Sequence, residues 1–208
     1  MKTLLKNALV VTMNANEEVY SEGSVLVEDD KISKIGHFEL KEDVDEVIDC
    51  KGKIIMPGLV NTHVHTSQQL GRGLGDDVNL LTWLHDRIWP YESNMTEEDS
   101  YVSTLACCLE QIKCGCTAFA EPGGQYVSGM ARGVAEKQEE DLKKFHNTHD
   151  GRVQVWFGLR TIFNCTDDLI VRSKELADKY NVGVHMHVAE VKDEVEYINN
   201  DEEKEYKV

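Results

Sequence analysis

From residue 57 onward, short apolar runs alternate with amphipathic helical patterns, and this alternation limits the fold more than any other feature of the sequence. Strands that alternate with helices form βα units and pair in a parallel sheet. Each apolar run ends in polar residues. Barrels and open α/β sheets place such strand ends at one edge, and their active sites lie there. We therefore predict an α/β fold with about four parallel strands, ending near His65, Glu121, Arg160 and Glu190.

The helical segments carry start and stop signals. Residues 80–88 have the apolar spacing of a helix, and Pro90 is predicted to end it because proline has no backbone N–H to donate. Thr96 is predicted to cap the next helix, with Asp99 completing a variant of the capping box. Two further helices are predicted, over residues 125–145 and 167–180.

Residues 1–56 have a different pattern. Four β-rich runs lie between turn signals, and the pair Asp29-Asp30 joins two of them as a tight hairpin would. The runs cover residues 8–12, 24–28, 31–35 and 53–56. We therefore predict a small all-β subdomain of the β-sandwich type over residues 1–56, followed by a βα domain over residues 57–208.

The charge balance limits the partners of this chain. It has 38 acidic and 22 basic residues and a net charge of −16, whereas nucleic acids and anionic membranes attract clusters of Lys and Arg. We find no apolar run of membrane-spanning length and no signal-peptide cleavage site. The six cysteines form no CxxC pair, which fits a reducing compartment. We therefore expect a cytoplasmic protein that binds neither nucleic acid nor membrane.

Two pairs of histidines suggest a metal site. His63 and His65 stand two residues apart at the end of an apolar run, and His185 and His187 repeat this spacing. On a strand, residues i and i+2 point to the same face, so each pair would place two imidazoles side by side. Neutral imidazoles are common metal ligands, although exposed or core histidines are the alternative interpretation of a single pair. Glu190 could bring an acid/base group to the same cavity.

Several stretches of the sequence together resemble the amidohydrolase superfamily, and within it the branch of methylthioadenosine/S-adenosylhomocysteine deaminases and triazine hydrolases. The resemblance covers the small N-terminal β unit and continues to about residue 190. The two most specific stretches are Pro57-Gly58-Leu59-Val60-Asn61-Thr62-His63-Val64-His65 and His185-Met186-His187-Val188-Ala189-Glu190. Supporting stretches lie at residues 81–84, 89–92 and 121–124.

The resemblance implies roles for five side chains. His63, His65 and His187 match the family's metal ligands, for Zn²⁺ or Fe²⁺. Glu190 matches the catalytic glutamate that contacts the substrate ring and moves a proton, and Glu92 matches a carboxylate that binds the substrate's sugar hydroxyls. The implied reaction is hydrolysis of non-peptide C–N bonds in cyclic amidines, with metal hydroxide attacking a ring carbon. The implied substrates are small molecules with purine-nucleoside-like or s-triazine-like rings.

The chain also departs from the family pattern. Relatives have a further metal-binding histidine on a sixth strand and an aspartate on the eighth, which is both ligand and general base. Four strands do not close a barrel, so the resemblance implies a partial (β/α) TIM-barrel fragment, weak metal binding and no activity of this chain alone. The short connection between Pro122 and Arg152 indicates an internal deletion near residue 140. Residues 159–163 lie where the nucleoside deaminases have a substrate-binding histidine, and none of the five is a histidine.

A non-enzymatic hypothesis stays open beside the hydrolase. The chain could be a truncated isoform, or a fragment from a gene model, that binds a full-length homologue or forms a homo-oligomer. Exposed sheet edges of an incomplete barrel motivate this hypothesis, because unpaired strand edges attract other strands.

Overall fold

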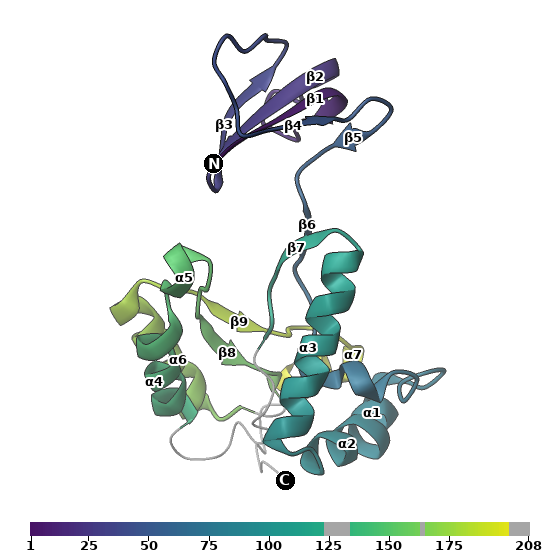
Figure 1. The fold of residues 1–208 in the computed structure, drawn as a ribbon. Coiled ribbons are helices and arrows are strands. Elements are labelled where there is room, and N and C mark those ends of the chain that lie inside the picture. Colours follow the sequence, from purple (N-terminus) through teal and green to yellow (C-terminus); the bar gives the residue numbers. More distant parts are fainter. Residues whose placement is uncertain (123–133, 163–164, 200–208) are drawn as a thin grey trace. The chain divides into compact units, whose positions relative to one another are not determined.

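The computed structural model describes residues 1–122, 134–162 and 165–199, and internal contacts divide the chain into two compact units, Met1–Leu59 and Val60–Val208. Figure 1 shows a mixed α/β architecture in which strands dominate the first unit and helices the second. None of the described helices has the length and apolar character needed to cross a membrane.

The first unit is a five-stranded sheet with the order β3-β2-β1-β4, in which β5 also pairs with β1. Antiparallel pairing joins β1 to β2 and β2 to β3, and the predicted hairpin at Asp29-Asp30 is confirmed by the pairing of Glu28 with Lys31. The strands are β1 (Lys2–Val11), β2 (Val19–Glu28), β3 (Lys31–Gly36), β4 (Glu46–Asp49) and β5 (Ile54–Ile55). A small core of Ala8, Val10, Val25 and Cys50 fills one region of this unit.

The remaining elements alternate between short strands and helices, as the sequence predicts. β6 pairs with β7, and β8 pairs with β9 in parallel. The elements are β6 (Leu59–Asn61), η1 (Thr66–Gly71), α1 (Leu80–Trp83), η2 (Leu84–Ile88), α2 (Trp89–Ser93), α3 (Glu97–Lys113), β7 (Cys116–Phe119), α4 (Val134–Phe145), α5 (Thr148–Gly151), β8 (Phe157–Leu159), α6 (Asp167–Tyr180), β9 (Val184–Met186) and α7 (Lys192–Asn199). The first part of the predicted helix 125–145 falls outside the described residues.

The strands of the second unit pair two by two rather than in one continuous sheet. The side chain of Gln138 on α4 occupies the edge of β8 that β9 leaves free. Its Nε2 donates to the Gly158 carbonyl at 2.8 Å, and its Oε1 accepts the Gly158 N–H at 3.1 Å. One side-chain amide therefore makes the two hydrogen bonds that a neighbouring strand would make there. With this edge of β8 satisfied, β8 does not pair with β7.

Two helix signals had opposite outcomes. The capping box of Thr96 and Asp99 is confirmed at the start of α3. The predicted helix end at Pro90 is wrong, because the helical path continues to Ser93. A π-helical turn, η2, precedes α2 and places Pro90 in the first turn of α2, where proline is tolerated.

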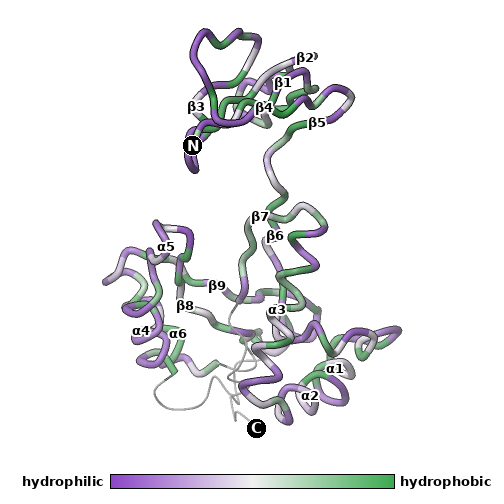
Figure 2. Tube along the Cα trace, viewed as in Figure 1, coloured by the Kyte–Doolittle hydropathy of each residue, from purple (hydrophilic) through white to green (hydrophobic). Residues whose placement is uncertain are grey.

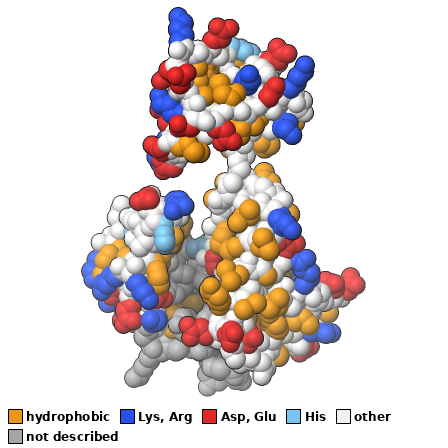
Figure 3. Space-filling view, viewed as in Figure 1, with side chains coloured by type: hydrophobic (Ala, Val, Ile, Leu, Met, Phe, Trp, Pro, Cys, Tyr) orange, Lys and Arg blue, Asp and Glu red, His pale blue; other side chains and the backbone are white. Residues whose placement is uncertain are grey.

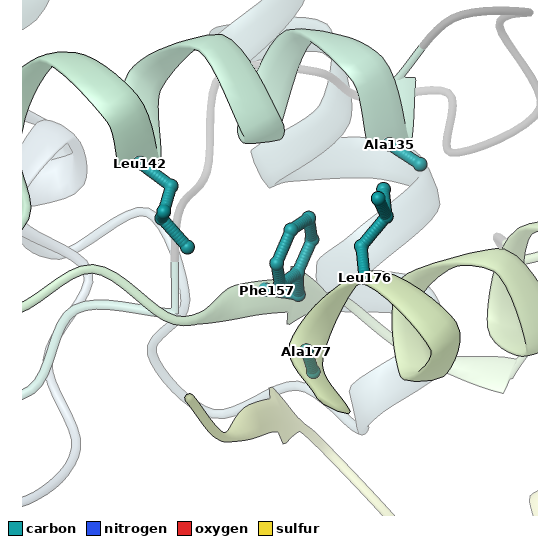
Figure 4. Packing of buried hydrophobic residues seen from close by; sticks show 5 residues of the cluster. All are labelled: Ala135, Leu142, Phe157, Leu176 and Ala177. Atoms are coloured by element: carbon teal, nitrogen blue, oxygen red, sulfur yellow. The ribbon is translucent and has the colours of Figure 1, made fainter. Parts of the chain in front are cut away.

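The core of the second unit centres on Phe157 of β8. Its ring lies between Ala135 and Leu142 of α4 and Leu176 and Ala177 of α6 (Figure 4). In Figure 2, α4 and α6 are mostly hydrophilic with hydrophobic residues at intervals. These two helices are therefore amphipathic and hold β8 and β9 in place from one side.

One face of α3 exposes large apolar side chains at helical spacing. Hydrophobic side chains gather over this helix in Figure 3. The exposed residues are Tyr101, Val102, Leu105, Leu109 and Ile112. In contrast, Ser103 and Cys107 on the opposite face are buried, so α3 buries a face of small side chains and leaves its larger apolar ones uncovered.

Candidate metal centre

Three histidines from two distant segments meet in the second unit. His63 and His65 follow β6, and His187 follows β9. The ring centroids are 5.3 Å apart for His63 and His65, 4.9 Å for His63 and His187, and 5.2 Å for His65 and His187. One ligand nitrogen from each ring lies within 4.8 Å of the others. The three imidazoles therefore converge on one point.

The first two histidines meet for a different reason from the one the sequence suggested. The strand pleat was predicted to place them side by side, but β6 ends at Asn61, so both lie in the segment that follows. The Asn61 side-chain oxygen accepts the His63 N–H at 3.2 Å, and the His65 carbonyl accepts the Gln68 N–H at 3.1 Å. Local turns, and not the alternation of a strand, therefore fix their backbone.

Arg160 holds His187 through its backbone. The Arg160 carbonyl accepts the His187 N–H at 3.0 Å and lies 2.7 Å from Nδ1 of the same residue. A carbonyl only accepts hydrogen bonds, so Nδ1 must carry the proton to bond with it. This leaves the lone pair on Nε2, which is the arrangement that orients a metal-binding histidine.

His65 is the most enclosed of the three, with 16% of its side chain exposed. Burial, together with the neighbouring His187 ring and Arg160 guanidinium, lowers its pKa to about 4. Nδ1 of His65 lies 4.0 Å from Oε1 of Glu121, whose other oxygen accepts the Thr66 N–H. His65 is therefore neutral near pH 7, the state in which an imidazole binds a metal.

Acidification should destabilise the metal-free chain through His65. Its pKa is about 6.5 when unfolded and about 4 when folded, so between these values only the unfolded state binds the extra proton. The contribution of His65 to the free energy of unfolding is complete above about pH 6.5 and is lost towards pH 4, by about 2 to 3 kcal/mol. Urea unfolding of the chain and of a His65→Gln variant across this range measures the effect. A variant with an unchanged pH profile would contradict it.

The donor set fits a catalytic zinc site. Such sites combine three protein ligands with one open coordination position, and the three histidines supply three imidazole nitrogens. A pocket of about 250 Å³ adjoins them, lined by His63, His185, Met186, His187, Val188 and Glu190. The three histidines would therefore hold an ion beside this pocket.

Glu190 lines the same pocket as His63 and His187, so the structure brings this candidate beside two of the three histidines. The Glu190 backbone N–H donates to the buried carboxylate of Glu194 on α7 at 2.7 Å. The Glu190 side chain itself is exposed. Its backbone is therefore anchored while its carboxylate faces solvent.

Glu92 does not line the pocket but forms a buried ion pair with Arg160. The Arg160 guanidinium donates to both carboxylate oxygens, at 2.8 and 3.2 Å, and Gln68 Nε2 donates at 2.8 Å. The two charged side chains are 5% and 10% exposed. The sequence did not predict this ion pair, because no local pattern links two residues that lie 68 positions apart.

Comparisons with known proteins identify the relatives of this chain. The profile of the amidohydrolase family matches residues 54–207. The 5'-deoxyadenosine deaminase of Methanobrevibacter smithii is 37% identical over 92% of this chain and 49% of its own length. The 5-methylthioadenosine/S-adenosylhomocysteine deaminase of Desulfitobacterium hafniense is 34% identical over 95% of this chain and 52% of its own length. The chain thus spans about half the length of the curated relatives it matches.

Solved structures share the fold. An adenosine deaminase from Xanthomonas campestris with bound zinc matches with a TM-score of 0.84 at 21% identity, over 96% of this chain and 52% of that one. A triazine hydrolase from Arthobacter aurescens matches with a TM-score of 0.78 at 19% identity, over 91% and 53%. Since the family profile covers well over half of the sequence, this chain belongs to the amidohydrolase family.

Proposed function

We propose that this chain carries the first part of the active site of a metal-dependent hydrolase that removes an amino group from an adenine-nucleoside-like ring. The observation that carries the proposal is the convergence of His63, His65 and His187 beside Glu190. The deaminase names of its relatives support this substrate class, and the triazine hydrolase fold keeps s-triazine rings as the alternative substrate.

The chain's own residues would divide the work. The three histidines would hold Zn²⁺, or Fe²⁺ in its place. When bound, the ion would supply Lewis-acid chemistry and lower the pKa of a water molecule to about 7. Glu190 is exposed at the pocket, where it could contact the substrate ring and carry a proton to a ring nitrogen. Glu92 would accept a hydrogen bond from a sugar hydroxyl.

We also propose that the 208-residue polypeptide turns over slowly on its own. Within the described residues, the candidate ligand group contains three histidines and no carboxylate. The group therefore lacks a carboxylate that could serve as both metal ligand and general base. Loss of a general base costs about 100- to 10,000-fold in rate. We expect the zinc-loaded chain to release ammonia from 5'-deoxyadenosine at least about 100-fold more slowly than the Methanobrevibacter enzyme.

The same assay separates the two proposals. Turnover that matches the full-length relative would contradict slow turnover by this polypeptide. Absence of any zinc-dependent binding of 5'-deoxyadenosine, followed by equilibrium dialysis, would instead contradict the proposed function. A Glu190→Gln variant should bind zinc as the wild type does and lose whatever turnover the wild type has.

A further inference from the structure

We propose that α3 is a dimerisation helix, through which two copies of this chain pack the exposed apolar faces of their α3 helices together in antiparallel orientation. Four large apolar residues form the centre of this face, and we call them the α3 seam: Val102, Leu105, Leu109 and Ile112. The inference does not rest on the proposed function, because the seam contains none of the candidate site residues.

The α3 seam has the spacing of a helix-packing surface. Its successive residues are three, four and three positions apart, which is the a and d repeat of a coiled coil. A helix normally turns such a stripe towards its own core, yet between 47% and 70% of each seam residue is exposed. Monomeric proteins rarely leave a large contiguous apolar patch uncovered, and Figure 3 shows the hydrophobic side chains that gather over α3. The seam therefore has the features of a surface that packs against another helix.

The rest of the chain holds α3 by the opposite face. The buried hydroxyl of Ser103 donates to the Thr66 carbonyl at 3.3 Å and accepts the Leu70 N–H at 3.2 Å. The Asn61 side chain donates to the side-chain oxygen of Gln111 at 3.3 Å. These contacts fix the rotation of α3 about its axis, so the seam cannot turn towards the core of its own chain.

The charges at the two ends of the seam favour a second copy in antiparallel orientation. Glu98 lies four residues before Val102, and Lys113 directly follows Ile112. Both charged side chains are exposed. Antiparallel packing brings Glu98 of each copy towards Lys113 of the partner subunit, whereas parallel packing would place like charges opposite each other.

A two-fold axis level with residue 107 satisfies both the apolar and the charged residues. Val102 then faces the partner subunit's Ile112, Leu105 faces the partner subunit's Leu109, and the symmetry repeats each contact. Glu98 lies about one helical turn along the axis from the partner subunit's Lys113, within reach of these two long side chains. The centre of the interface carries no charge, although the whole chain has a net charge of −16.

Sedimentation equilibrium over a series of protein concentrations tests the inference, with EDTA present so that zinc cannot bridge two copies. We expect the mass to approach twice that of one chain, with a dissociation constant in the micromolar range. Leu109→Glu places a carboxylate in both central layers and should weaken dimerisation by at least about 100-fold. Val171→Glu on α6 is the matched control, because Val171 is 59% exposed and Leu109 is 58% exposed, and it should dimerise as the wild type does.

Exchange of the two charges tests the orientation. Glu98→Lys and Lys113→Glu should each weaken dimerisation by about 5-fold, because each turns two attractive contacts into repulsive ones. The double variant should regain the affinity of the wild type. In a parallel dimer, either single reversal would replace one pair of like charges with another and leave the affinity unchanged.

Three outcomes would overturn the inference. The mass of a single chain at every concentration up to about 1 mM would assign the seam to a different partner. A dimer that Leu109→Glu leaves intact, or that Val171→Glu weakens equally, would place the interface elsewhere on the chain. Single charge reversals without effect, or a double variant no tighter than the single ones, would rule out the antiparallel orientation.

Discussion

Replacing His63 with alanine should weaken zinc binding by more than about 100-fold and leave the fold intact. Loss of a group that merely supports a ligand costs 10- to 100-fold in metal affinity, and His63 is a candidate ligand itself. Its ring lies 4.9 Å from that of His187 and 5.3 Å from that of His65, so its removal leaves two nitrogens. His63 is exposed, so its truncation opens no cavity in a core.

Calorimetric titration of the metal-free chain with zinc measures this effect, and thermal unfolding checks the fold. His85→Ala is the matched control, because His85 is an exposed histidine on η2 that packs against Trp89 and lies outside the candidate ligand group. It should bind zinc as the wild type does. If His63→Ala also bound zinc as tightly as the wild type, the three-histidine site would be ruled out.

Local signals in the sequence predicted the helices better than the strands. The capping box of Thr96 and Asp99 acts within four residues, and it forms as predicted. The last strand was expected to end near Glu190, but β9 (Val184–Met186) ends four residues earlier. Directly after β9, the His187 N–H donates to the Arg160 carbonyl. A pattern of apolar residues cannot reveal such a long-range contact.

The residues of the candidate site also divide into those that local patterns reveal and those that only long-range contacts reveal. Residue type and spacing were enough to select His63, His65 and His187, and the structure brings them together. The ion pair of Glu92 and Arg160 could not be predicted, because it depends on how α2 and the end of β8 meet. Motif reading therefore identified the groups with known chemistry, while the groups that hold them in place required three-dimensional contacts.

Replacing Arg160 with methionine should lower the free energy of unfolding by about 3 to 5 kcal/mol. The carboxylate of Glu92 is 5% exposed and receives two of its three hydrogen bonds from Arg160. Without the guanidinium, the negative charge would stay buried beside Gln68 alone. An uncompensated buried charge costs more than the lost attraction, because water cannot replace the missing partner.

Urea unfolding measures this cost, and the chain offers its own control in the ion pair of Arg72 and Glu110, whose side chains are both exposed. Arg72→Met should cost about 1 kcal/mol or less, because water solvates the carboxylate left behind. The double variant Arg160→Met, Glu92→Met should recover much of the lost stability, since apolar residues of similar size often replace a buried ion pair without loss. Equal costs for Arg160→Met and Arg72→Met would show that water reaches Glu92. The ion pair with Arg160 would then not act as a buried pair.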